Sequence, residues 1–152
     1  MPNLPASIGR GISVAVANKA TDRRMRNVAA GLLSATGTVE WVDKEDLLDP
    51  VTAVSGSGPA YVFLLAEALT AAAVNAGLPA ELAAKLARET IAGSGELLRQ
   101  SPLDAASLRK NVTSPGGTTA AALDVLMGPG GLETLLLTAV AMATRRSREL
   151  AG

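Results

Sequence analysis

Residues 111–119, Asn-Val-Thr-Ser-Pro-Gly-Gly-Thr-Thr, hold the polar groups of this sequence that are best suited to bind a ligand. Four hydroxyl side chains and two glycines precede a predicted helix that begins near Thr119. Glycine lets the backbone approach a ligand closely, hydroxyls donate further hydrogen bonds, and the free N–H groups of a helix N-terminus favour an anion. No lysine follows the glycines as in a phosphate-binding loop, so a carboxylate is favoured over a nucleotide phosphate. An ordinary loop with helix-capping threonines is the alternative.

A second glycine-rich turn, Ser-Gly-Ser-Gly-Pro at residues 55–59, also leads into a predicted helix. It has two interpretations: an anion site, or a place where glycine allows close packing. The second is favoured because the helix that follows is apolar.

Other side chains limit the chemistry further. The sequence has no cysteine and no histidine, which excludes disulfides, thiol nucleophiles, Ser-His catalysis and the common zinc sites, and we predict no metal site. Glu67 lies in an apolar stretch, where burial would raise its pKa or demand a partner, and a structural role is favoured over catalysis. Five other carboxylates form an acidic stretch that is interpreted as solvated: Glu40, Asp43, Glu45, Asp46 and Asp49.

Two partner classes are disfavoured by the overall pattern. Fourteen basic and fourteen acidic residues give no net charge, which argues against nucleic acid or an anionic membrane surface as partner. Arg145, Arg146 and Arg148 form a basic run that is explained by the dipole of a final helix. No GxGxxG dinucleotide fingerprint is present, because residues 9–11 and 56–58 each lack the third glycine and the preceding strand.

The elements that would position these residues are unevenly distributed. Residues 11–17 and 38–42 are predicted strands, and residues 22–36 a helix capped by Thr21 or Asp22. Two strands alone do not make a stable sheet. The first 42 residues therefore resemble the trailing edge of a larger α/β unit.

Everything after about residue 43 is predicted to be helical. Asp49 and Pro50 are expected to begin a short helix, and residues 101–104 are interpreted as a capping box for another. The longer helices are predicted at residues 59–76, 80–99, 119–127 and 132–150.

The helix predicted at residues 59–76 is apolar on every side. It is at the lower length limit of about 18 residues for a membrane span, carries a carboxylate in its middle and lacks flanking basic anchors. Burial within a helical oligomer is favoured over membrane insertion, and we predict a dimer.

Three motifs together resemble one enzyme family. Met-Pro-Asn-Leu-Pro-Ala at residues 1–6, Val-Ser-Gly-Ser-Gly-Pro-Ala-Tyr-Val-Phe at residues 54–63 and the stretch at residues 111–119 are similar, in order and spacing, to motifs of pyrroline-5-carboxylate reductases. The turn at residues 144–147 of the last helix is also similar.

The resemblance implies an N-terminal Rossmann domain that binds NADPH or NADH, followed by an all-α domain that interlocks with its partner into a homodimer, sometimes in higher assemblies. The family reduces 1-pyrroline-5-carboxylate to proline, in the cytoplasm. This chain would hold a Rossmann remnant of two strands and one helix at residues 1–43, and the mainly α dimerisation and substrate-binding domain at residues 44–152.

The resemblance also implies roles for individual residues. Thr119 is expected nearest the ring nitrogen of the substrate, as the catalytic residue. Pro2 and Asn3 are expected on the cofactor side. The substrate-binding set is expected to comprise Asn111, Val112, Ser114, Gly116, Gly117, Thr118 and Thr119.

This sequence departs from the family in beginning where the nucleotide-binding domain is nearly finished. We therefore expect no cofactor binding and no reductase activity from the chain alone. The alternative is a non-enzymatic module, derived from that family, for oligomerisation or for binding a proline-like ligand.

Overall fold

A computed structural model describes all of residues 1–152. The chain divides into two compact units, the first formed by residues 1–61 and 137–152 and the second by residues 62–136. The predicted domain division at residue 43 stays a prediction.

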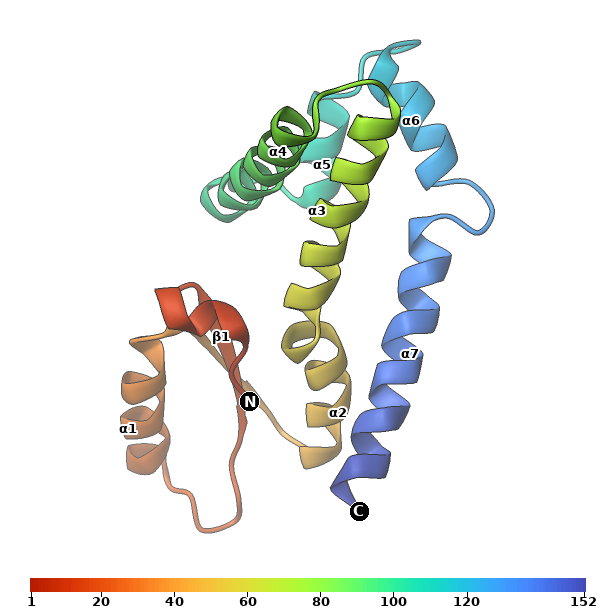
Figure 1. Cartoon of the computed structure of the whole chain (residues 1–152). Coiled ribbons are helices and arrows are strands. Elements are labelled where there is room, and N and C mark those ends of the chain that lie inside the picture. The colour runs from red at the N-terminus through yellow and green to blue at the C-terminus, as the bar shows by residue number, and fades with distance from the viewer. The chain divides into compact units, whose positions relative to one another are not determined.

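The first unit begins with a β-α-β arrangement (Figure 1). A 3-10 turn, η1 (Leu4–Ile8), precedes strand β1 (Gly11–Val16), helix α1 (Arg23–Ser34) and strand β2 (Gly37–Val42). The two strands are parallel, with Gly11 opposite Gly37. A Cβ atom at Gly37, where φ is +140°, would collide with the Gly11 carbonyl oxygen, so the strands can start this close only with glycine there.

Helix α1 is held by a cap at its N-terminus and by a side-chain contact with strand β2. The Asp22 carboxylate accepts a hydrogen bond from the Met25 amide at 2.7 Å, which confirms Asp22 as the cap. The Arg26 guanidinium lies 5.0 Å from the centroid of the Trp41 ring on β2, a cation–π contact. These local interactions hold the helix against the strands.

A nearly continuous helical segment then connects the two units. It consists of η2 (Glu45–Leu47), α2 (Leu48–Val51), the wide π turn η3 (Thr52–Gly56) and the start of α3 (Gly58–Asn75). The prediction that Asp49 caps a helix is wrong, because helical turns already begin at Glu45 and Asp49 lies inside α2. Its carboxylate instead accepts a hydrogen bond from Ser147 at 2.7 Å and lies 3.6 Å from Arg148, so Asp49 is not simply solvated either.

The second unit is entirely helical. It contains most of α3, then α4 (Ala80–Gln100), α5 (Ala105–Asn111), α6 (Thr118–Leu126) and the start of α7 (Leu132–Ala151). The predicted capping box is wrong in detail: Asp104, and not Ser101, is the N-cap of α5, and Ser101 accepts a hydrogen bond from the Leu103 amide. The long helices begin and end within about one or two residues of the predicted positions, which is the usual uncertainty of helix ends.

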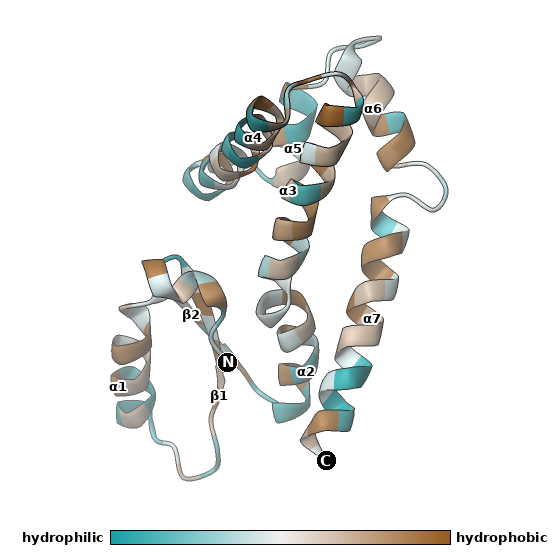
Figure 2. Cartoon of the chain, viewed as in Figure 1, coloured by the Kyte–Doolittle hydropathy of each residue, from teal (hydrophilic) through white to brown (hydrophobic).

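The fold class is confirmed as mainly α, with a remnant of two strands and one helix in front. Very little of the chain is buried by the chain itself: the buried apolar residues are Val14, Ala53, Ala83 and Ala87. Apolar residues recur along α3, whereas α4 alternates between apolar and polar positions (Figure 2). In α3 the Phe63 and Leu64 side chains are 54% and 62% exposed. The most apolar helix, α3, is therefore largely exposed to solvent in the single chain.

Candidate substrate-binding loop

The loop between α5 and α6 is anchored at its beginning by the last turn of α5. The amides of Val112 and Thr113 donate to the carbonyls of Arg109 and Lys110, at 3.3 and 3.0 Å. The Thr113 hydroxyl donates to the Arg109 carbonyl at 2.7 Å. One of the four hydroxyls predicted to face a ligand is therefore used to end the helix.

The next four residues form a tight turn. The Gly117 amide donates to the Ser114 carbonyl at 3.0 Å, Pro115 occupies the second position and Gly116 has φ of +70° at the third. Proline followed by a residue with positive φ is the signature of a type II turn. The sequence Ser-Pro-Gly-Gly thus sets the direction in which the chain enters α6.

The turn delivers unpaired backbone amides to the start of α6. Gly117 is the N-cap, with an extended backbone and no side-chain cap, and the first helical hydrogen bond runs from the Ala121 amide to the Gly117 carbonyl. The N–H groups of Thr118 and Thr119 consequently have no acceptor within the chain. Free amides and the positive end of the helix dipole together favour a bound anion.

Side-chain hydroxyls surround these amides. Those of Ser114, Thr118 and Thr119 make no hydrogen bond within the chain, and Thr119 is half-buried while the other two are exposed. Asn111 and Val112 are exposed at the end of α5. Gly117 belongs to the expected substrate-binding set, but its amide is already bonded inside the turn. The free amide donors are therefore those of Thr118 and Thr119.

The predicted cofactor-side residues belong to the first unit, whereas the loop belongs to the second. Met1 and Val14 exchange two backbone hydrogen bonds, at 2.8 and 3.0 Å, which places residues 1–3 beside β1. The Asn3 side-chain oxygen accepts from the Ile12 amide at 3.0 Å and takes the place of a strand carbonyl, while Pro2 is exposed. The side-chain nitrogen of Asn3, Nδ2, makes no hydrogen bond within the chain.

The second glycine-rich turn does not present a helix N-terminus. The Ser57 amide donates to the Thr52 carbonyl, so helical turns pass through this segment, and the anion interpretation is wrong there. Close approach is what its glycine allows: a Cβ atom at Gly56 would lie 2.6 Å from the Met1 methyl carbon. The buried Ser55 hydroxyl, which has no partner, was not singled out by the sequence.

Comparison with known proteins decides the family. Residues 45–150 match the family described as pyrroline-5-carboxylate reductase dimerisation. The chain belongs to the pyrroline-5-carboxylate reductase family. Curated reductases of this name from Synechocystis and Pseudomonas aeruginosa are 45% and 44% identical to it, each aligned over 99% of this chain and 55% of its own length.

Solved reductases share the fold. The Coxiella burnetii pyrroline-5-carboxylate reductase superposes with a TM-score of 0.93 at 41% identity, covering 99% of this chain and 55% of that protein. The Plasmodium falciparum pyrroline carboxylate reductase, solved with NADP bound, gives a TM-score of 0.85 at 34% identity over 100% of this chain and 62% of its own. The chain thus spans about half the length of the curated reductases that it matches.

Proposed function

We propose that this chain is the substrate-binding and dimerisation part of a cytoplasmic pyrroline-5-carboxylate reductase, which reduces 1-pyrroline-5-carboxylate to L-proline. The observation that carries the proposal is the pair of unpaired amides at Thr118 and Thr119, presented by the Ser-Pro-Gly-Gly turn. A five-membered ring that carries one carboxylate next to its nitrogen suits this loop, because the amides can hold the carboxylate while a hydroxyl meets the nitrogen. Residues 44–152 would form this domain and residues 1–43 the end of the nucleotide-binding domain.

Each site residue has a distinct task in this proposal. The amides of Thr118 and Thr119, with the Ser114 and Thr118 hydroxyls, hold the carboxylate, and the backbone of Gly116 and Gly117 shapes the turn. The Thr119 hydroxyl orients the ring nitrogen. Asn111 and Val112 border the loop.

The hydride comes from NADPH or NADH held by a nucleotide-binding domain. The described residues do not fit the whole cofactor, because no glycine fingerprint follows β1 or β2. In this proposal, Pro2 and the free side-chain nitrogen of Asn3 line only the nicotinamide side of the cofactor site. What the chain contributes is therefore positioning of the substrate, which is a large part of catalysis in a reaction whose difficult chemistry belongs to the cofactor.

Binding of L-proline, measured by calorimetry, tests the loop. Thr119→Val keeps the side-chain volume and removes the hydroxyl, and we expect it to weaken binding about tenfold, the equivalent of one hydrogen bond of about 1.4 kcal/mol. Thr113→Val is the matched control, since its hydroxyl is bonded to α5. We expect Thr113→Val to leave the affinity unchanged. Equal effects of the two variants, or no binding by a folded chain, would contradict the proposed site.

Turnover tests the reductase assignment separately. The chain alone is expected to show no oxidation of NADPH with 1-pyrroline-5-carboxylate. Addition of the nucleotide-binding domain of the Synechocystis relative should produce it. Proline binding without any such rescue would favour the non-enzymatic module.

We also propose that the chain forms a homodimer, and that such dimers can associate into a higher oligomer. The family match names dimerisation, and α3 exposes large apolar side chains that a second copy could cover.

A further inference from the structure

Glu67 is the charged residue of α3, and its surroundings are apolar. Phe63 and Leu64, four and three residues earlier in the helix, share its face and are more than half exposed. Covering this face with a second copy removes water from the Glu67 carboxylate as well. A carboxylate that loses its water needs a charged or hydrogen-bonding partner.

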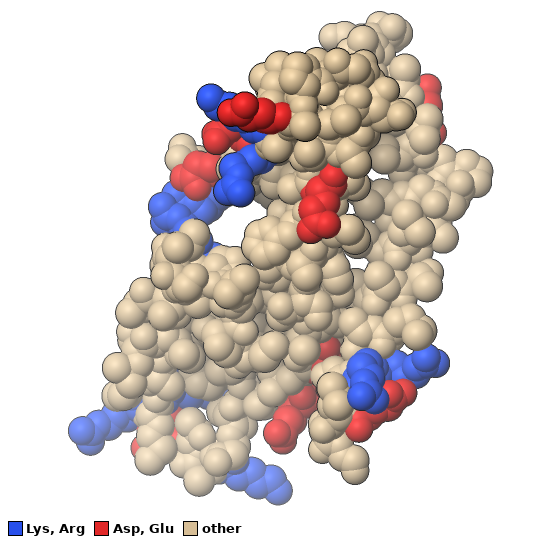
Figure 3. Space-filling view, in the orientation of Figure 1, with Lys and Arg blue, Asp and Glu red and all other residues tan.

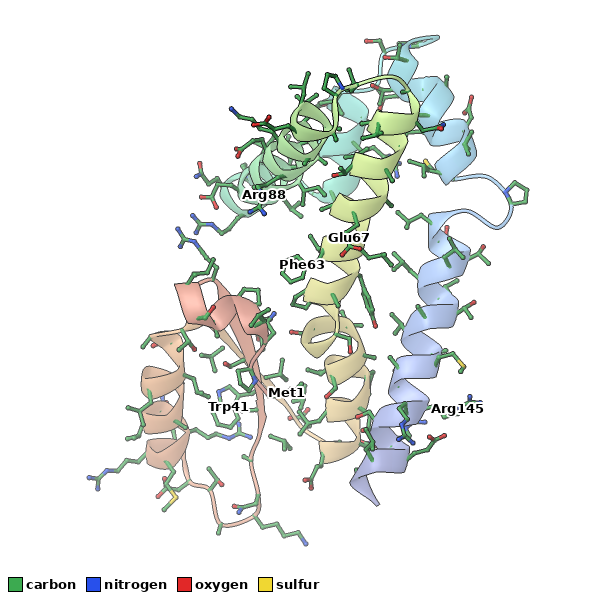
Figure 4. All side chains as sticks on the ribbon, in the orientation of Figure 1. Met1, Trp41, Phe63, Glu67, Arg88 and Arg145 are labelled. Carbon is green, nitrogen blue, oxygen red and sulfur yellow. The ribbon has the colours of Figure 1, made fainter.

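Arg88, a cation without an ion-pair partner, lines the same hollow as Glu67. Ala66, Glu67, Thr70 and Ala71 of α3, together with Ala84 and Arg88 of α4, line an open hollow of about 400 Å³. Figure 4 labels Glu67 and Arg88 on these two helices. Arg88 makes no ion pair within the chain, and neither does Glu67.

No side chain of the same chain forms an ion pair with Glu67 or with Arg88. The residues three and four positions from Arg88 along α4 are Ala84, Lys85, Ile91 and Ala92. Lys85 adds a like charge and no carboxylate is among them, so the helix gives Arg88 no i,i+4 partner. The short side chains of the hollow leave space for a side chain from outside.

We infer that Glu67 of one copy pairs with Arg88 of the other copy, twice in each dimer. In a two-fold symmetric interface, a contact from residue i to residue j is always accompanied by the contact from j to i. One hollow that carries one anion and one cation, both unpaired in their own chain, is therefore self-complementary. The inference rests on the proposed dimer and is independent of the reductase activity.

Charge reversal with mixing distinguishes pairing between copies from pairing within one chain. The variants Glu67→Arg and Arg88→Glu each place like charges opposite one another in their own homodimer. Mixed one to one, they give a heterodimer in which both pairs are again of opposite charge. Pairing within one chain would give no such recovery, because each mutant chain keeps its own like charges.

We expect each single variant to weaken the homodimer at least tenfold, and the one-to-one mixture to recover most of the lost affinity. Native mass spectrometry with a size-tagged copy counts the heterodimers, and circular dichroism checks the helices. If one variant does not fold alone, the two variants can be co-expressed and the heterodimers counted in the same way. Glu89→Arg, an exposed reversal beside Arg88 and outside the hollow, is the control and should leave the dimer unchanged.

Two results would overturn the inference while leaving the dimer in place. The first is a dimer whose affinity neither variant changes. The second is a pair of weakened variants that mixing does not restore. A wild-type chain that is monomeric at micromolar concentration would instead show that the proposed dimer itself is wrong.

Discussion

Single residues in the loop between α5 and α6 divide into those that shape it and those left free to bind. Pro115 and Gly116 shape the turn, Thr113 ends α5, and the hydroxyls of Ser114 and Thr119 stay free. The division follows from backbone dihedral angles, which only glycine satisfies without strain at positive φ. The residues that shape the turn therefore leave the hydroxyls of Ser114 and Thr119 free.

Gly116→Ala is expected to destabilise the protein by about 1–2 kcal/mol, the cost of placing a Cβ atom in the left-handed region. A Cβ atom there would meet nothing within 4 Å, so the effect is one of backbone strain and not of collision. We also expect weaker proline binding, since the turn aims the amides.

Gly95→Ala is the control for this substitution, because Gly95 lies inside α4, has open space around it and has no positive φ. Chemical unfolding should show it to be neutral or stabilising, as alanine favours helices. A Gly116→Ala protein as stable as the wild type would contradict the type II turn.

At the scale of elements, α5 determines where the loop begins. Its N-cap, Asp104, accepts a hydrogen bond from the Ser107 amide at 2.7 Å. The hydrogen bonds from Ser107 hold the pKa of the Asp104 carboxyl below its usual value. The ionised cap therefore contributes stability above the pKa of the unfolded chain, and this contribution is lost as the pH falls through the lowered pKa of the folded state.

Asp104→Asn keeps a capping oxygen and removes the titration. The wild type should be the more stable protein above about pH 4.5, a little above the ordinary pKa of an aspartate. The difference in stability should shrink as the pH falls below the ordinary pKa of an aspartate, because the contribution of the ionised cap is lost as the pH falls through the lowered pKa of the folded state. Urea unfolding at fixed protein concentration between pH 7 and pH 3 measures this. A difference that stays constant across the range would show that the charge of Asp104 plays no part.

At the scale of the whole molecule, the most apolar helix, α3, exposes large apolar side chains such as Phe63 and Leu64. Charged side chains gather over α4 and near the end of α7, and much of the remaining visible surface is uncharged (Figure 3). By length and composition the segment Glu45–Asn75 could cross a membrane, and none of its most apolar window is buried. In the proposed homodimer a second copy would cover these apolar side chains, and the matching family is described as a dimerisation domain.

The temperature of unfolding should therefore rise with protein concentration, because association stabilises the folded state by mass action. Scanning calorimetry over a hundredfold range of concentration, together with light scattering for the mass, tests this. A constant unfolding temperature and a monomeric mass would contradict the dimer.

The sequence by itself determined most of the elements and the site loop. The Asp22 cap and the Ser-Pro-Gly-Gly turn both act through neighbouring residues, so their dihedral angles and hydrogen bonds can be predicted from spacing alone. The family motifs are local in the same sense.

Only the tertiary structure decided the interactions between distant segments. Asp49 bonds to Ser147, 98 residues away, and so does not behave as its local pattern predicted. Gly56 allows the close packing that was favoured for its turn, but its local pattern does not identify the neighbour, Met1. Asn3 is likewise fixed by an amide of β1 that its own motif does not contain. The physical reason is that a local pattern specifies which groups are available, whereas their partners depend on which segments the folded chain brings within hydrogen-bonding distance.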